Sequence, residues 1–229
     1  MKLPLSKRLQ VCAGFVSPGD RVADIGCDHG YLGIHLLTQG TARSVIAADI
    51  NEGPLQSAMR NAVKYGVRGK MTFYLSDGVR NIPRDFDTMV CAGMGADTMI
   101  SILESAPWLR DSRYRLILQC QSKTPMLRKY LSDTGWRITE ESALEDGRFL
   151  YTVMVVSWQP EYPRLSLGEC WFPPVLLEHP GPETAGYFHR IYDGLALAVQ
   201  HGESGEKAEA LRYLESLAAD FFWLKESAK

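Results

Sequence analysis

The sequence lacks the features of several large protein classes. Its five cysteines lie far apart and include no C-x-x-C pair, which argues against both a zinc site and a disulfide framework. No stretch approaches the roughly 20 apolar residues of a membrane span, and Lys7 and Arg8 stand where a signal peptide would carry its apolar run. We therefore expect a cytoplasmic protein with reduced thiols, no bound metal and no membrane segment.

The chain also lacks the strong positive charge of many nucleic-acid-binding proteins. Its 45% hydrophobic and 23% charged residues are ordinary for a folded protein, and its net charge is −2. Residues 1–159 carry 19 Lys and Arg against 16 Asp and Glu, whereas residues 160–229 carry 6 against 11. A nucleic-acid surface is therefore expected on the first part, where the candidate phosphate contacts are Lys7, Arg8, Arg60, Lys64, Arg68, Lys70, Arg80 and Arg84.

Strand-like and helical patterns alternate along residues 1–135. An opening helix is predicted over residues 5–16 with Ser6 as its N-cap, and further helices begin at Asn51 and Thr124. Apolar runs typical of buried strands occur at Arg21–Ile25, Ser44–Asp49, Met71–Leu75, Phe86–Cys91 and Arg115–Cys120. This alternation predicts an α/β fold, with a parallel sheet covered by helices on both faces.

The pattern changes after Gly135. Trp136–Leu144 and Phe149–Trp158 are strand-like runs joined by a short Asp-Gly turn, which predicts a β-hairpin and brings the sheet to seven strands. This is the layout of a Rossmann-like fold whose last strand is antiparallel. Residues 159–182 are rich in proline and are predicted to be a linker. Apolar spacing in residues 183–201 and 206–226 predicts a C-terminal antiparallel helical hairpin, so we place domains at residues 1–159 and 160–229.

The turn after the first strand combines two carboxylates with two glycines. Asp24 ends the strand, Asp28 lies inside the turn, and Gly26 and Gly30 let the backbone approach a ligand closely. Dinucleotide-binding turns use a similar layout for a pyrophosphate, but their G-x-G-x-x-G spacing is absent and the carboxylates would repel phosphates. S-adenosylmethionine, which carries an ammonium and a sulfonium and no phosphate, fits better. In the alternative interpretation the turn binds no ligand, and it is only a glycine-rich turn whose carboxylates cap the helix that follows.

Two later carboxylates fit the same cofactor. Asp49 ends the second strand about 25 residues after Asp24, near the spacing expected of a carboxylate that accepts ribose hydroxyls. Asp77 follows the third strand and can accept a hydrogen bond from an adenine amino group, although an Asp-Gly turn with Gly78 explains it equally well. Gly93 follows the fourth strand, at the edge where open α/β sheets place their chemistry.

The chain resembles a known family, the bacterial tRNA adenine-22 N1 methyltransferases called TrmK. The resemblance covers about residues 3–158 and rests on Leu5–Leu9, Asp24–Leu32, Ala48–Asn51, Ser76–Gly78, Ala92–Gly95, Leu118-Gln119 and Gly135-Trp136. It implies a Rossmann-like methyltransferase fold, S-adenosylmethionine as cofactor, and a C-terminal helical domain that helps to hold tRNA. The chain departs from the family pattern at Cys27, Gly33 and Ala96, which affects the detail of the loops rather than the reaction class.

The acceptor side of the site is predicted around the first turn. The Asn/Asp-Pro-Pro-Tyr/Phe sequence, usual in enzymes that methylate exocyclic amines of DNA bases, is absent. A ring nitrogen such as N1 of neutral adenine needs no proton removed before attack, which is compatible with this absence. Asp28 is then predicted to stabilise the cationic product, while His29 either orients the substrate or only satisfies backbone groups.

We therefore expect an S-adenosylmethionine-dependent, monomeric methyltransferase that modifies N1 of adenine 22 in the D-loop region of tRNA. The alternatives are a methyltransferase for a small molecule or a protein, and a non-catalytic cofactor-binding module. The predicted catalytic residues are Asp28, His29 and Tyr31. The predicted cofactor-binding residues are Asp24, Gly26, Cys27, Gly30, Asp49, Ile50, Asp77, Gly78, Gly93 and Met94.

Overall fold

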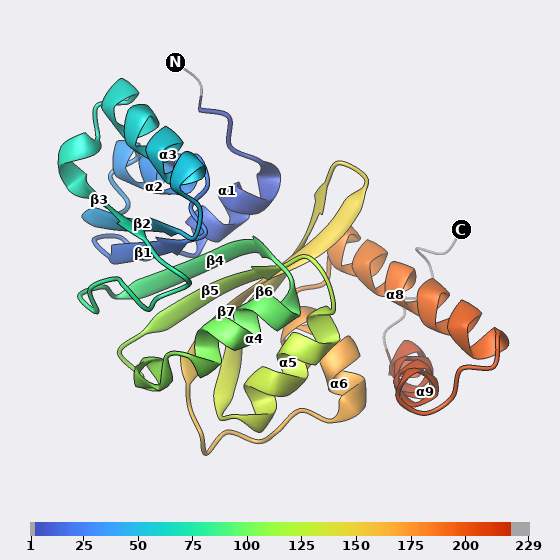
Figure 1. Ribbon diagram of the computed structural model, residues 1–229. Helices are drawn as coiled ribbons and strands as arrows, with labels where there is room; N and C mark the ends of the chain where they lie inside the picture. Colours follow the sequence, from blue (N-terminus) through green and yellow to red (C-terminus); the bar gives the residue numbers. More distant parts are fainter. Residues whose placement is uncertain (1–2, 221–229) are drawn as a thin grey trace.

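Residues 3–220, the part of the chain that the computed structural model describes, are built around a seven-stranded sheet (Figure 1). The strand order is β3-β2-β1-β4-β5-β7-β6, in which β1 to β5 run parallel and β7 runs antiparallel to both of its neighbours. The predicted Rossmann-like fold is confirmed. The strands are β1 (Arg21–Ile25), β2 (Ser44–Asp49), β3 (Met71–Leu75), β4 (Thr88–Met94), β5 (Arg115–Cys120), β6 (Trp136–Asp146) and β7 (Phe149–Trp158).

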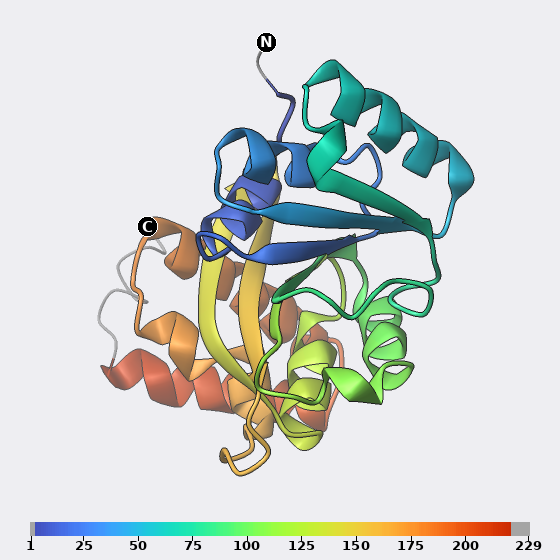
Figure 2. The ribbon, with the colours of Figure 1, turned by 90° about the vertical axis from the view of Figure 1, so that its left-hand side faces the viewer.

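Helices cover both faces of this sheet (Figures 1 and 2). Because successive side chains of a strand point to opposite faces, Val22 packs in one core cluster and its neighbour Ala23 in the other. Both faces are buried, which explains why the central strands read as continuous apolar runs. The first cluster is covered by α1 (Lys7–Gly14), α2 (Tyr31–Thr38) and α3 (Glu52–Lys64), and the second by α4 (Ala96–Glu104) and α5 (Thr124–Asp133). Short 3-10 helices span Arg68–Lys70 and Pro107–Leu109.

The largest shift of a predicted parallel strand is in β4, which was expected at Phe86–Cys91. Phe86 precedes the strand because its ring packs against Trp108 and Tyr114. At its other end the strand continues to Met94, and a bulge at Gly93 shifts its register against β5. β4 therefore carries the Gly-Met segment into the edge of the sheet instead of ending before it.

The predicted linker is partly wrong, because two short helices form within it. These are α6 (Leu167–Trp171) and α7 (Pro174–Leu177). The Ser166 hydroxyl accepts a hydrogen bond from the Glu169 backbone N–H, and the Glu169 carboxylate accepts one from the Ser166 N–H at 2.7 Å. This capping box starts α6 despite the surrounding prolines.

The C-terminal region contains α8 (Pro182–Gln200) and α9 (Glu206–Asp220), which confirms two helices joined by a turn. The predicted residues 221–226 of the second helix lie outside the described part. Figure 1 looks along α9 while α8 lies across the view, so the two helices cross. α9 packs against both α6 and α8. None of the described helices is both long and apolar enough to cross a membrane.

A fully buried arginine connects the sheet domain to this C-terminal region. The Arg128 guanidinium of α5 donates to Glu141 of β6 at 2.6 Å, to the Cys170 carbonyl at 2.9 Å and to the Tyr187 hydroxyl at 3.0 Å. A buried charge of this kind is stable only while its partners remain in place. The division into domains at residues 159 and 160 stays a prediction, and these contacts connect the two parts closely.

Candidate functional site

The loops at the carboxyl ends of β1, β2 and β4 meet at one edge of the sheet. β1 pairs with β2 on one side and with β4 on the other, so Asp24 lies directly beside Ala47 and Val90. The strand order changes direction at β1 and β4, the point where open α/β sheets form a crevice for ligands. A cavity of about 220 Å³ lies there, lined by Arg8, Leu9, Asp24, Gly26, Cys27, Asp28, His29, Tyr31, Leu32, Ala92 and Gly93.

Asp24 is the most buried carboxyl group of this cavity, with 4% of its surface exposed. Its Oδ2 atom has no hydrogen-bond partner among the described residues. Burial, with smaller contributions from the nearby Asp49 and Asp28, raises the pKa of Asp24 to about 7 against the opposing hydrogen bond from the Gly33 N–H. A buried acceptor without a donor favours a ligand that brings a positive charge.

Asp49 holds the first loop in place. Its Oδ2 accepts a hydrogen bond from the Asp28 N–H at 3.0 Å, and its Oδ1 accepts one from the Asn51 N–H at 2.9 Å. Each carboxylate oxygen has a second lone pair, so the group can still accept from a ligand. Asn51 occupies the predicted N-cap position of α3, but its side chain makes no capping hydrogen bond.

The two loop glycines are required by their backbone conformation and by their surroundings. Gly26 and Gly30 have φ of +72° and +71°, a region that residues with a Cβ seldom occupy. A Cβ on Gly26 would lie 2.3 Å from the Met94 Cε, and one on Gly30 would lie 2.9 Å from the Ala58 Cβ. The loop after β1 therefore contacts the Gly-Met segment of β4 at Gly26, so the two segments can form one site.

The three predicted catalytic residues lie together at the open side of the cavity. The Asp28 Oδ1 is 3.6 Å from the His29 Nε2, and the side chains are 69% and 51% exposed. The rings of His29 and Tyr31 lie 5.8 Å apart. The Asn61 side-chain amide donates to the His29 carbonyl at 3.0 Å, which anchors this stretch to α3.

The Gly-Met segment of β4 is held by a residue that the sequence interpretation did not place in the site. The Gln119 Oε1 of β5 accepts a hydrogen bond from the Gly93 N–H at 3.0 Å, and Gln119 is fully buried. A glutamine inside an otherwise apolar strand is the signal that could have identified it. Its amide fixes the backbone at the bulge where β4 leaves the sheet.

Six of the predicted cofactor residues are not among those that line the cavity. Gly30, Asp49 and Met94 lie next to lining residues, in the sequence or through the contacts given above, and the remaining three lie farther along the same edge. Ile50, Asp77 and Gly78 follow β2 and β3, the next strands along the same edge. Ile50 is 63% exposed, and the Asp77 carboxylate pairs with Arg80 at 3.1 Å. Gly78 is buried against Ile102, so it supports the loop rather than facing solvent. Ile50 and Asp77 therefore present an apolar and an acidic side chain to solvent along this edge, outside the cavity.

The cysteine of the loop is a packing residue and not a thiolate. Cys27 is 6% exposed, and burial, reinforced by the charge of Asp24, raises the pKa of its thiol. Within residues 3–220 no group of three or more His, Cys, Asp or Glu side chains is arranged to bind a metal ion. The loop therefore offers carboxylates and backbone groups to a ligand.

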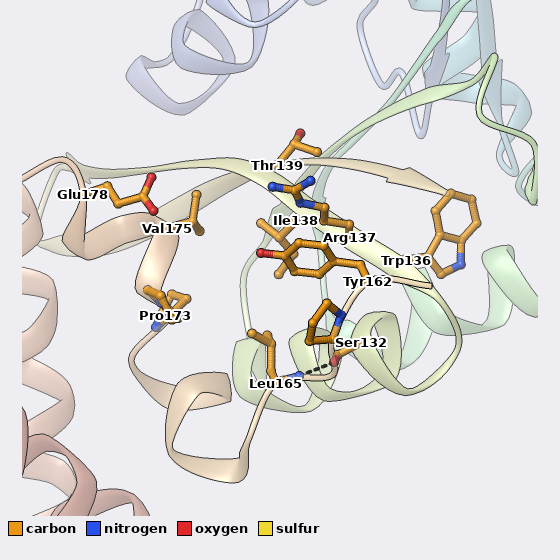
Figure 3. Close-up of a pocket in the computed structure, with 12 residues that line it drawn as sticks. Ser132, Trp136, Arg137, Ile138, Thr139, Tyr162, Leu165, Pro173, Val175 and Glu178 are labelled. Atoms are coloured by element: carbon orange, nitrogen blue, oxygen red, sulfur yellow. Dashed lines mark hydrogen bonds between the residues drawn. The ribbon is translucent and has the colours of Figure 1, made fainter. Parts of the chain in front are cut away.

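A second cavity, of about 110 Å³, lies away from this edge. It is formed by the start of β6, the segment around Tyr162, and α7 (Figure 3). The Arg137 guanidinium stacks over the Tyr162 ring at 4.0 Å, and the Ser132 hydroxyl accepts from the Leu165 N–H at 2.6 Å. It contains none of the predicted site residues, and we regard it as a packing gap between the edge strand and the segment that follows β7.

Comparisons with a family model and with a curated protein both show similarity to methyltransferases. The family described as "Methyltransferase domain" matches residues 5–154. The chain is 34% identical over 155 residues to the tRNA (adenine(22)-N(1))-methyltransferase of Bacillus subtilis, and the match covers 67% of this chain and 65% of that protein, slightly less than two thirds.

Two solved structures are similar over nearly the whole chain. The first is a putative tRNA (m1A22) methyltransferase of Streptococcus pneumoniae in complex with S-adenosyl-L-methionine, with a TM-score of 0.82, 30% identity, and coverage of 93% of this chain and 98% of that one. The second is the B. subtilis M1A22 tRNA methyltransferase TrmK, with a TM-score of 0.77, 27% identity and full coverage of both chains.

Proposed function

Since the chain belongs to the TrmK family of methyltransferases, we propose that it transfers a methyl group from S-adenosylmethionine to N1 of adenine 22 in tRNA. The observation that carries this proposal is the pair of carboxylates at the ends of β1 and β2. Asp24 is buried with a free acceptor oxygen, and Asp49 orders the adjoining loop. The relatives bind this cofactor or act on this nucleotide according to their names.

The residues of the site fit the chemistry of the cofactor. The unpartnered Asp24 oxygen suits an ammonium, and the remaining acceptor capacity of Asp49 suits ribose hydroxyls. The exposed side chain of Ile50 offers an apolar surface to an adenine ring, with Asp77 beside it as an acceptor for the exocyclic amine. A pyrophosphate would meet these carboxylates with repulsion.

The backbone segments of the cavity complete the proposed cofactor site. The cavity is lined by Gly26 and Cys27 of the first loop and by Gly93 of β4, and we propose that Gly30 and Met94 complete the site. A side chain at position 26 would have to displace the end of the Met94 side chain and would be strained by the positive φ of Gly26. When bound, S-adenosylmethionine supplies a methyl group on a sulfonium, an electrophile that needs no metal.

The acceptor base is proposed to enter beside Asp28, His29 and Tyr31. N1 of neutral adenine attacks with its own lone pair, the bond between sulfur and methyl breaks toward sulfur, and the ring acquires the positive charge. No general base is required, so catalysis rests on positioning. The exposed Asp28 carboxylate stabilises the cationic ring, and the Tyr31 and His29 rings offer stacking surfaces for a base that has left its helix.

The partner in this proposal is tRNA, which also makes the cytoplasm the expected location. A direct test is methyl transfer from labelled S-adenosylmethionine to an unmodified tRNA transcript, with a second transcript in which adenine 22 is replaced by guanine. We expect label in the first transcript only and a primer-extension stop at nucleotide 22. Equal labelling of both transcripts would refute the assigned nucleotide. Cofactor binding without transfer to any tRNA would favour the binding module, or an enzyme for another substrate.

A further inference from the structure

Four basic side chains on α3 and on the short 3-10 helix that follows it have no acidic partner. They are Arg60, Lys64, Arg68 and Lys70, they are all exposed, and together they form the α3 basic cluster. Residues 53–76 contain 4 Lys and Arg and no Asp or Glu. Among the described residues, no carboxylate forms an ion pair with any member of the cluster. This part of the surface therefore carries a positive charge that nothing nearby compensates.

The other candidate phosphate contacts from the sequence already have partners. Three of them are in ion pairs, namely Lys7 with Glu183, Arg8 with Asp146 and Arg80 with Asp77. The Arg84 guanidinium lies over the Trp108 ring, 4.7 Å from its centroid. Arg84 also precedes β4, so it lies at the edge of the sheet opposite the cavity. The structure thus leaves one group of neighbouring cations as the candidate surface for a polyanion.

The contacts that the cluster does make leave its charge available. The Arg60 guanidinium donates to the Ser57 hydroxyl at 2.8 Å, and the Arg68 guanidinium donates to the Met71 carbonyl at 3.0 Å. These neutral acceptors orient the two side chains without cancelling their charge. Arg60 and Lys64 are four residues apart on α3, a spacing at which like charges destabilise a helix. Binding of an anion removes this repulsion.

α3 also supports the loop where the acceptor base is proposed to enter. The Asn61 side-chain amide donates to the His29 carbonyl at 3.0 Å. Arg60 directly precedes Asn61 on α3, and Lys64 lies about one turn beyond it. A base that enters beside His29 therefore brings the phosphates of its flanking nucleotides toward these two cations.

The C-terminal helices, the other candidate surface for tRNA, lie at the opposite end of the sheet. α3 packs on β2 and β3, whereas α8 packs on β6, the strand at the other edge (Figures 1 and 2). Residues 182–220 contain 3 Lys and Arg against 7 Asp and Glu. A surface with this excess of acid repels phosphates, so electrostatics favours α3 as the side that holds RNA.

We propose that the α3 basic cluster binds the backbone phosphates of the tRNA nucleotides that flank the methylated base. The inference rests on the proposed function and extends it by naming the surface that holds the substrate. Phosphate contacts from Lys and Arg supply affinity that does not depend on sequence, fix the position of the nucleic acid and make binding sensitive to salt. The C-terminal helices then support the core and contribute little to RNA affinity through their charges.

The first experiment measures binding of an unmodified tRNA transcript, at several salt concentrations, to the triple variant Arg60→Gln, Lys64→Gln, Arg68→Gln. We expect an affinity about tenfold or more below that of wild type, and a salt slope of log K smaller by about two to three. Affinity for S-adenosylmethionine should be unchanged, because none of these residues lines the cofactor cavity. A tRNA affinity within about twofold of wild type would overturn the proposal.

The matched control removes the same number of charges from the C-terminal helices, in the triple variant Arg190→Gln, Lys207→Gln, Arg212→Gln. Its tRNA affinity should stay within about twofold of wild type. A loss in this control as large as that in the α3 variant would contradict the assignment, because the C-terminal helices or the total charge of the protein would then determine tRNA binding.

A variant that preserves charge separates phosphate binding from local structure. Arg60→Lys combined with Arg68→Lys keeps both charges and removes the guanidinium bonds to Ser57 and Met71. Its tRNA affinity should remain within about threefold of wild type. A loss as large as that of the glutamine variant would show that the guanidinium contacts, and not the charges, are what matters, and the proposal would fail. If the wild type binds no tRNA at all, the proposed function fails too, and that result appears without any substitution.

Discussion

At the residue scale, the account depends most on Asp24. Its carboxyl lies at the end of β1, 4% exposed, with one oxygen unpartnered and with Asp28 and Asp49 nearby. Burial raises its pKa to about 7, so the free protein contains a carboxyl group that is only partly ionised near neutral pH. A positively charged ligand favours the ionised form of the Asp24 carboxyl. The protonation of this side chain therefore makes both the stability of the protein and its affinity for the ligand depend on pH.

The pH dependence of stability follows from this pKa. The folded state retains the Asp24 proton up to about pH 7, whereas the unfolded chain releases it near the ordinary pKa of an aspartate, 3.8. The free energy of unfolding of the ligand-free protein should therefore fall as pH rises through this range. Asp24→Asn should remove the penalty and stabilise the protein at pH 8 by up to about 4 kcal/mol, since one pKa unit corresponds to about 1.4 kcal/mol.

Thermal unfolding of the ligand-free proteins between pH 5 and pH 8 checks this prediction. The difference between the wild-type and Asp24→Asn proteins should already be present at pH 5, because the unfolded chain is ionised there, and should grow up to about pH 7. Asp193→Asn is the matched control, because it removes an exposed carboxylate of α8 that does not contribute to the pKa of Asp24. If the pH profile of Asp24→Asn were also parallel to that of wild type, ionisation of the buried Asp24 carboxyl would not lower the free energy of unfolding, and the prediction would be wrong. Calorimetry should also show that Asp24→Asn loses cofactor affinity.

At the scale of single elements, the sequence predicts the central strands well because these strands are buried on both faces. β1, β2 and β5 have the predicted bounds, since an uninterrupted apolar run is what a parallel strand between two layers of helices requires. β3, the partly exposed edge strand, has its predicted bounds as well. β4 differs because its ends depend on tertiary contacts. Phe86 joins an aromatic cluster, and Gly93 is held by Gln119 from the next strand.

The short helices α6 and α7 escaped prediction for a local reason. Prolines around Leu167–Trp171 and Pro174–Leu177 indicate irregular structure, yet proline is also tolerated in the first turn of a helix. Ser166 and Glu169 have the spacing of a capping box, a helix-start signal that the sequence interpretation did not use. In the site, the carboxylates were predictable from their position after strands. Arg8 was predicted only as a phosphate contact, because the sequence does not show what the fold reveals, that Arg8 lines the same cavity as Asp24 and that its Nε is buried.

At the scale of the whole molecule, the sheet domain and the C-terminal region share one buried polar network. Arg128 is surrounded by Glu141, Thr152 and Tyr187, and it also bonds to the Cys170 carbonyl. The ring of Phe188, next to Tyr187, packs against Phe172. The C-terminal helices therefore complete the core of the protein as well as presenting a surface.

Removal of residues 183–229 tests this coupling. The sequence alone predicts a truncated protein that binds tRNA weakly and keeps cofactor binding, provided that the core folds without these helices. The structure predicts instead that the truncation destabilises the core, because it takes the Tyr187 hydroxyl from the buried Arg128 and uncovers Phe172. Circular dichroism melting and calorimetry should show a much lower Tm together with loss of cofactor binding.

The full-length variant Tyr187→Phe is the matched control for this deletion. It removes only the hydroxyl bond to Arg128 and should lower the free energy of unfolding by about 1 to 3 kcal/mol, with cofactor affinity unchanged. A truncated protein that melts like wild type and binds the cofactor normally would show that residues 183–229 form a detachable domain.

The most direct test of the central claim is calorimetric titration of the wild-type protein with S-adenosylhomocysteine, NAD and ATP under identical conditions. The claim is that carboxylates at the ends of β1 and β2 select an adenosine compound that carries an ammonium and no phosphate. We predict saturable binding of S-adenosylhomocysteine and no measurable heat with NAD or ATP. Tight binding of NAD or ATP, with no response to S-adenosylhomocysteine, would contradict the account.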